Sequence, residues 1–149
     1  MAFVSLTRLH LRAWYHFLAF GVHAQRAARQ AERSPGFLGG ALSGDLRRRT
    51  FWTATIWSDE AAMRAYLVTG AHRVVMPKIG TWCDESAVAR IENADARVPT
   101  AEEALEHMRK HGRPVRLSRP SPAHAAGATV PDGRPPRFAQ TLRPVQGPQ

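Results

Sequence analysis

One histidine, His72, is the residue of this sequence whose surroundings best suit it for chemistry. It opens an otherwise apolar helical stripe, in which side chains recur at three- and four-residue steps: His72, Val75, Met76, Ile79, Trp82 and Cys83. A histidine on such a stripe points inward, where it could act as a general base near neutral pH or as the axial ligand of a haem. The remaining interpretation is a core histidine hydrogen-bonded to a backbone carbonyl near a helix break at Gly70.

Aromatic and cationic side chains could complete a site around His72. Aromatic groups around one cleft would hold a flat, hydrophobic molecule, and we predict a substrate pocket lined by Trp52, Trp57, Tyr66, Met76 and Trp82. Arg8 and Arg73 are candidates for holding an anion, because a guanidinium pairs well with a carboxylate or an enolate. The predicted catalytic residues are therefore His72, Arg73 and Arg8, with no metal ligand unless His72 binds haem.

Missing signatures exclude several other chemistries. The single cysteine, Cys83, excludes an internal disulfide framework and a cysteine-based zinc site, and it favours a cytoplasmic location. The segment GFLGG at 36–40 lacks the spacing of a dinucleotide-binding loop, and no phosphate-binding loop or nucleophile elbow is present. His107 and His111 lie four residues apart but have no third metal ligand nearby in the sequence. The expected cofactor is thus none or haem, without a flavin, NAD or zinc signature.

The elements that must position these residues follow a regular order. Strand-like segments at 3–11, 37–46, 50–57 and 86–91 alternate with helical patterns at 13–33 and 59–83, the second of which breaks at Gly70. A last helix spans 100–111, and Thr100 and Glu103 form its capping box. This β-α-β-β-α-β order predicts an α+β, ferredoxin-like fold, with a four-stranded antiparallel sheet and both helices on one face. The other face would be bare, which favours sheet-to-sheet homodimerisation.

The remaining chain, 113–149, differs in composition from the predicted domain at 1–112. It carries six arginines, one acidic residue and eight of the eleven prolines, and it accounts for over half of the net charge of +9. We predict an extended or disordered tail, because such a composition buries little apolar area. Phe138 is its only aromatic residue, so specific nucleic-acid recognition is not expected. The longest aromatic-rich run, 13–24, is too short to span a bilayer.

Four blocks of the sequence resemble a known superfamily: SPGFLGG at 34–40, FWTATIWSDEAAMRAY at 51–66, GAHRVVMPKIGTWCDE at 70–85 and PTAEEALEHMRKHGRP at 99–114. The first three are similar to the dimeric α/β-barrel superfamily, best known for the antibiotic biosynthesis monooxygenases. The last resembles an uncharacterised bacterial domain family within it, and the segment from strand to GAH is distantly similar to spheroidene monooxygenase, a haem enzyme. The resemblance implies a homodimeric, monooxygenase-like enzyme acting on a hydrophobic or aromatic small molecule. A haem-binding oxygenase and a non-catalytic ligand-binding or assembly protein are the alternatives.

Overall fold

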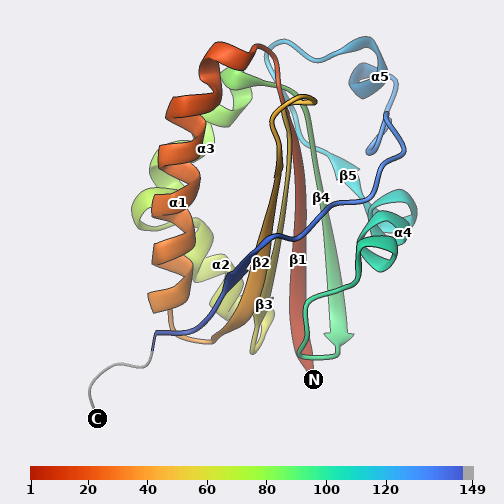
Figure 1. The fold of residues 1–149 in the computed structure, drawn as a ribbon. Helices are drawn as coiled ribbons and strands as arrows, with labels where there is room; N and C mark the ends of the chain where they lie inside the picture. Colours follow the sequence, from red (N-terminus) through yellow and green to blue (C-terminus); the bar gives the residue numbers. More distant parts are fainter. Residues whose placement is uncertain (146–149) are drawn as a thin grey trace.

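The fold is a six-stranded antiparallel sheet with helices on both faces (Figure 1). The computed structural model describes residues 1–145. The strands are β1 (Ala2–Leu11), β2 (Phe37–Asp45), β3 (Thr50–Trp57), β4 (Cys83–Ala94), β5 (Arg113–Pro114) and β6 (Gln140–Leu142), in the order β5-β4-β1-β3-β2-β6. The helical elements are the 3₁₀ turn η1 (Trp14–His16), α1 (Phe17–Arg33), α2 (Glu60–Leu67), α3 (Gly70–Trp82), α4 (Ala101–His111) and α5 (Pro122–Ala125).

The ferredoxin-like core predicted from the sequence is confirmed. Strands β4, β1, β3 and β2 form the predicted antiparallel sheet, and the helices α1, α2 and α3 lie on one of its faces. Local chemistry explains the boundaries: the Asp59 side chain accepts from the Ala62 N–H to begin α2, and Thr100 and Glu103 form the capping box of α4. The sheet has six strands rather than four, because two short strands from the tail extend both of its edges.

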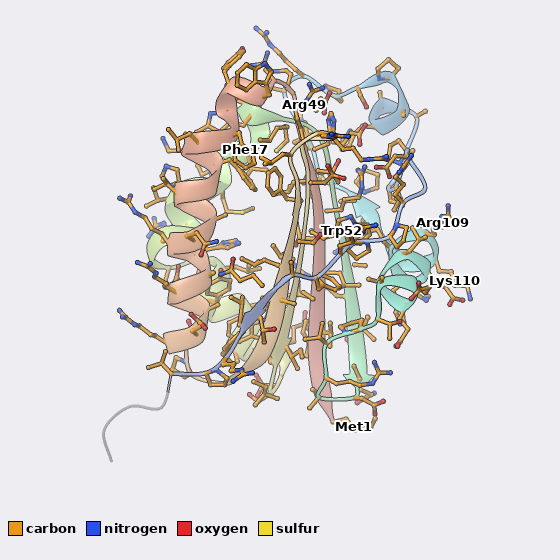
Figure 2. The ribbon with its side chains drawn as sticks, viewed as in Figure 1. Met1, Phe17, Arg49, Trp52, Arg109 and Lys110 are labelled. Carbon is orange, nitrogen blue, oxygen red and sulfur yellow. The ribbon has the colours of Figure 1, made fainter. Side chains whose placement is uncertain are left out.

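The central strand β1 divides its side chains between two environments. Across β1 and β3, Phe3 pairs with Trp57, whereas Arg8 pairs with Trp52. Since successive side chains of a strand point to opposite faces, Phe3 and Trp57 lie on the face towards α1, α2 and α3, here called the helix face. Arg8 and Trp52 lie on the other, here called the tail face. Figure 2 shows Phe17 of α1 and Trp52 on the two sides of the sheet.

The tail face is covered, so the prediction of a bare face is wrong. Met108 of α4 and Val130 of the tail pack there against Leu6 and Trp52, and all four side chains are buried. The tail is low in apolar residues, but the few that it has are placed where the sheet needs cover. The sheet-to-sheet homodimer stays a prediction. It would need the tail face to be free, and in this structure α4 and the tail of the same chain cover that face.

The tail also closes the edges of the sheet. Strand β5 pairs with β4, and β6 pairs with β2. Leu142 of β6 is buried in the same cluster as Phe37 and Trp57, and His124 of α5 is buried with its Nε2 3.1 Å from the Ser86 carbonyl oxygen. Within residues 1–145, no helix has the length and apolarity needed to cross a membrane.

Candidate functional site

The residues predicted to form one site lie in separate places. Trp52 and Trp57 both belong to β3, and their spacing of five residues places them on opposite faces of the sheet. Trp57 and Tyr66 lie on the helix face near His72, whereas Arg8 lies with Trp52 on the tail face. The predicted pocket lined by both tryptophans therefore does not form.

His72 is held at the break between α2 and α3. Its backbone N–H donates to Gln30 Oε1 of α1 at 2.8 Å, while Gln30 Nε2 donates to the carbonyl of Thr69 at 2.7 Å. Gly70 adopts a φ of 58°, and a Cβ there would lie 3.0 Å from the Gln30 side chain, so glycine suits the position. The break predicted at Gly70 is present, and a single glutamine on α1 satisfies its backbone groups.

The ring of His72 is engaged locally. Its Nδ1 donates to the Leu67 carbonyl oxygen at 3.1 Å, and the ring centroid lies 4.8 Å from that of Tyr66. Burial lowers the pKa of His72, and the Leu67 hydrogen bond opposes this shift without cancelling it. Neutral His72 is thus a histidine hydrogen-bonded to a backbone carbonyl at the helix break. This is the third of the interpretations that the sequence left open.

The neighbouring aromatic residues fill the core rather than line a cavity. Trp57 is fully buried, with its ring centroid 5.1 Å from that of Tyr66 and 5.2 Å from that of Phe37. The Tyr66 hydroxyl donates to the Ala27 carbonyl oxygen at 3.0 Å, and burial raises its pKa. This packing fixes α2 against α1 and the sheet.

These surroundings do not fit a haem at His72. A haem needs a broad cavity beside its axial ligand, and none of the three main hollows in the described part of the chain is lined by His72. Its ring already contacts that of Tyr66, with 4.8 Å between the ring centroids. Arg73, which could have met a haem propionate, is exposed. We therefore derive no chemistry through haem.

The other predicted site residues have different neighbours. Met76 is exposed on α3. Trp82, at the end of α3, is half-buried between His16 and His23, at centroid distances of 6.0 and 5.6 Å. Lys78 Nζ lies 5.9 Å from the Trp82 ring, within the range of a cation–π contact.

Arg8 forms a buried ion-pair network. Its side chain is 1% exposed, with Nη1 2.8 Å from Glu85 Oε1 on β4 and Nη2 3.4 Å from Asp132 Oδ1 in the tail. The carboxylates of Glu85 and Asp132 thus occupy two nitrogens of the Arg8 guanidinium. The predicted role of Arg8 was to bind the anionic group of a ligand, whereas here its partners belong to the protein itself.

The hollow with the most aromatic lining lies elsewhere, where η1 and the start of α1 meet the β2–β3 hairpin. Its volume is about 470 Å³, and we call it the aromatic hollow; its lining residues are Trp14, Tyr15, Phe17, Leu18, Leu46, Arg47 and Arg49. Trp14 is 73% and Leu18 78% exposed, which is unusual for side chains of this size. Figure 2 shows Arg49 and Met1 at opposite ends of the sheet.

Two arginines give the aromatic hollow a positive charge. Arg49 has a φ of 53° and donates from Nε to the Leu11 carbonyl oxygen at 3.1 Å, which fixes its guanidinium at the hairpin. Arg48 is paired with Asp45. Among residues 1–145, Arg47 has no ion-pair partner, so its charge is available to a ligand.

A histidine stands beside this hollow. The His16 ring centroid lies 4.4 Å from that of Tyr15, and Arg12 Nη2 donates to His16 Nε2 at 3.3 Å. Burial and then the charge of Arg12 lower the pKa of His16, which favours the neutral imidazole. His16 and His72 are far apart, because Phe17 and the His72 partner Gln30 are separated by 13 residues of α1, about 20 Å.

Sequence reasoning missed the aromatic hollow. Helical periodicity predicts a helix from residue 13, which places Trp14 and Phe17 on its buried face. In the structure Trp14–His16 form a 3₁₀ turn, and α1 begins only at Phe17. The change of period turns Trp14 and Tyr15 outward. The sequence features that could have indicated this hollow are the aromatic segment WYHF at 14–17 and the arginine-rich turn at 47–49.

Comparison with known proteins identifies solved structures that share this fold. The sequence matches no protein-family model and no curated protein. Among solved structures, it is similar to SnoaB, a cofactor-independent oxygenase from Streptomyces nogalater, with 17% identity, a TM-score of 0.52, and coverage of 63% of this chain and 94% of that one. An antibiotic biosynthesis monooxygenase has 15% identity and a TM-score of 0.55, covering 64% of this chain and 100% of its own. Rv0793 from Mycobacterium tuberculosis has 10% identity and a TM-score of 0.57, covering 64% and 97%.

These matches cover 63–64% of this chain and 94–100% of the three neighbours. About a third of this chain therefore lies outside the shared fold. The core that ends with β4 spans residues 1–94, which is 94 of 149 residues, or 63% of the chain. The chain therefore has the ferredoxin-like fold of the antibiotic biosynthesis monooxygenases.

Proposed function

We propose that this protein is a monooxygenase-like enzyme that acts on a flat, aromatic small molecule carrying a negative charge. The aromatic hollow is the observation that carries the proposal. Its volume of about 470 Å³ lies within the range typical of small-molecule sites. The rings of Trp14, Tyr15 and Phe17 suit an aromatic ligand, and the guanidinium of Arg47 suits a carboxylate or a phenolate.

The shared fold supports an oxygenation as the reaction class. One structural neighbour is described as a cofactor-independent oxygenase. An oxygenation that uses only dioxygen and the substrate inserts one oxygen atom and releases the other as water, with two hydrogens taken from the substrate. Such a substrate must be electron-rich, and an ionised phenol or enol meets this need.

His16 is the best-placed group for the proton transfer. Its neutral imidazole can accept a proton, and its ring packs against that of Tyr15, which lines the hollow. A substrate hydroxyl would replace Arg12 as the partner of His16 Nε2. This assignment moves the acid–base role from His72, whose Nδ1 donates to the carbonyl of Leu67 at the end of α2.

A non-catalytic ligand-binding protein is the second candidate. It is favoured by the open rim of the hollow, where Trp14, Tyr15, Leu18 and Leu46 are all strongly exposed. Binding and turnover can be measured separately, so one set of variants distinguishes the two functions.

The binding test uses hydroxynaphthoic acids as probes, titrated by calorimetry. Trp14→Ala and Arg47→Gln are each expected to weaken binding about tenfold, equivalent to about 1.4 kcal/mol. Val68→Ala and Arg64→Gln are matched controls, because both side chains are exposed on α2 or at its end, away from the hollow. Failure of every probe to bind, or unchanged binding in Trp14→Ala, would contradict the proposal.

The turnover test follows oxygen consumption with the probes that bind. An enzyme is expected to consume oxygen and to yield a product with one oxygen gained and two hydrogens lost, as measured by mass spectrometry. His16→Gln should reduce this rate while retaining binding. Binding without any oxygen consumption across the panel would favour the ligand-binding function.

A further inference from the structure

We propose that His10, Asp84 and Glu85 form a binding site for a first-row transition-metal dication. The three residues come from adjacent strands at one end of the tail face. His10 and Glu85 are paired across β1 and β4, and the register shift after His10 brings Asp84 to the same place. This site is independent of the proposed function, since the aromatic hollow is built on the helix face.

The donor atoms have nearly the spacing that a metal requires. One atom from each of the three side chains lies within 4.8 Å of the other two, and His10 Nδ1 is 2.5 Å from Asp84 Oδ1. Bonds of about 2.0–2.2 Å to one ion bring two donors to within about 4.4 Å of each other. Small side-chain rotations would therefore suffice. The ligands are half-buried, so solvent can reach the ion.

The local charge also calls for a cation. The whole chain has twelve acidic residues and a net charge of +9, yet Glu85 and Asp132 both pair with Arg8, and Asp84 lies beside His10 and Glu85. Three carboxylates thus lie near the His10 ring and the Arg8 guanidinium. A dication would balance part of their negative charge.

Arg8 supplies a second, independent observation. Its side chain is 1% exposed, and its Nε is buried with no hydrogen-bond partner in the described structure. A buried N–H without a partner marks a missing acceptor. Three protein ligands leave coordination positions open, and a metal-bound water or carboxylate oxygen is the kind of acceptor that would satisfy Arg8. The Arg8 contact to Glu85 Oε1 would orient that ligand, as outer-shell partners do.

The donor set selects the class of metal. Calcium and magnesium prefer oxygen ligands only, whereas one imidazole with two carboxylates suits zinc, manganese, iron or cobalt. His107 and His111 on α4 are the competing pair, with ring centroids 6.2 Å apart. They offer two donors on an exposed helix, which makes them the matched control.

The experiment titrates the untagged, chelator-treated full chain with Zn²⁺, Mn²⁺ or Co²⁺ by calorimetry. Wild type is expected to bind one ion per chain. His10→Gln and Asp84→Asn, which keep polar side chains of similar shape, should each bind at least about tenfold more weakly, because even outer-shell losses cost about 10–100-fold. The double variant H107A/H111A should bind as wild type does. Circular dichroism establishes that each variant is folded.

Three results would overturn the site. They are absence of binding of all three ions by wild type, unchanged affinity in both His10→Gln and Asp84→Asn, and loss of binding in the H107A/H111A variant. A visible d–d band of bound Co²⁺ that disappears in His10→Gln would support nitrogen ligation by this histidine.

Discussion

Arg8 of β1 and Glu85 of β4 lie diagonally across the two strands with 2.8 Å between Nη1 and Oε1, and both side chains are largely removed from solvent. The same guanidinium reaches Asp132, so one arginine joins two strands and the tail. A buried pair of this kind is costly to break from one side, because the remaining charge loses its partner.

Arg8→Met is therefore expected to lower the free energy of unfolding by about 3–5 kcal/mol, since Glu85 and Asp132 are left without their cation. Urea denaturation measures the change. Arg64→Met is the control, because its pair with Glu60 is exposed and worth at most about 0.5 kcal/mol. A stably folded Arg8→Met protein with impaired catalysis would instead restore the anion-binding role for Arg8.

His72 should make stability depend on pH. Burial lowers its pKa in the folded state below the ordinary 6.5, so the unfolded chain takes up a proton first as the pH falls. The stabilisation is complete above pH 6.5 and is lost as the pH decreases towards the folded-state pKa. Urea midpoints at about pH 8 and about pH 5.5 should differ less in His72→Gln than in wild type. His16 shifts in the same direction, so His16→Gln is measured in parallel.

Cys83 should be unreactive in the native protein. The side chain is fully buried, and burial, followed by the charge of Asp84, raises its pKa to about 12. Little thiolate exists at neutral pH, and reagents cannot reach it. Labelling with a thiol reagent, followed by mass spectrometry, is expected to proceed only when urea unfolds the chain. Rapid labelling under native conditions would show that β4 opens locally.

Leu142 tests whether the tail belongs to the core. Its side chain is 3% exposed and packs with Phe37 and Trp57. Leu142→Ala should lower the free energy of unfolding by about 2–3 kcal/mol, within the range for buried leucines. Val145→Ala, three residues further along and exposed, should change it by less than about 0.5 kcal/mol. Equal effects of the two substitutions would mean that β6 does not pack as described.

The fold was predictable because its signals are local. Alternation in Thr50–Trp57, the cap at Asp59 and the break at Gly70 each concern a few neighbouring residues, and each is present in the structure. The site was less predictable because it depends on which face each side chain takes. Even so, the five-residue spacing of Trp52 and Trp57 already excludes a shared pocket in one strand.

Two features needed information that local patterns do not hold. The 3₁₀ turn at Trp14–His16 changes the direction in which its aromatic side chains point. No capping residue before it in the sequence predicts this turn. The cover of the tail face depends on contacts between Val130 or Met108 and strands more than 70 residues earlier, such as β1. Composition indicated a weakly apolar tail, but it could not show where single apolar side chains would pack.

The outer strands β5 and β6 have a consequence for how the protein is made. Both come from residues 113–142, so during synthesis the four central strands emerge before either of their outer partners. Until then, β2 and β4 expose unpaired backbone groups, which can pair with other nascent chains. Synthesis of residues 113–142 thus completes the sheet, and conditions that slow translation of these residues should raise the aggregated fraction.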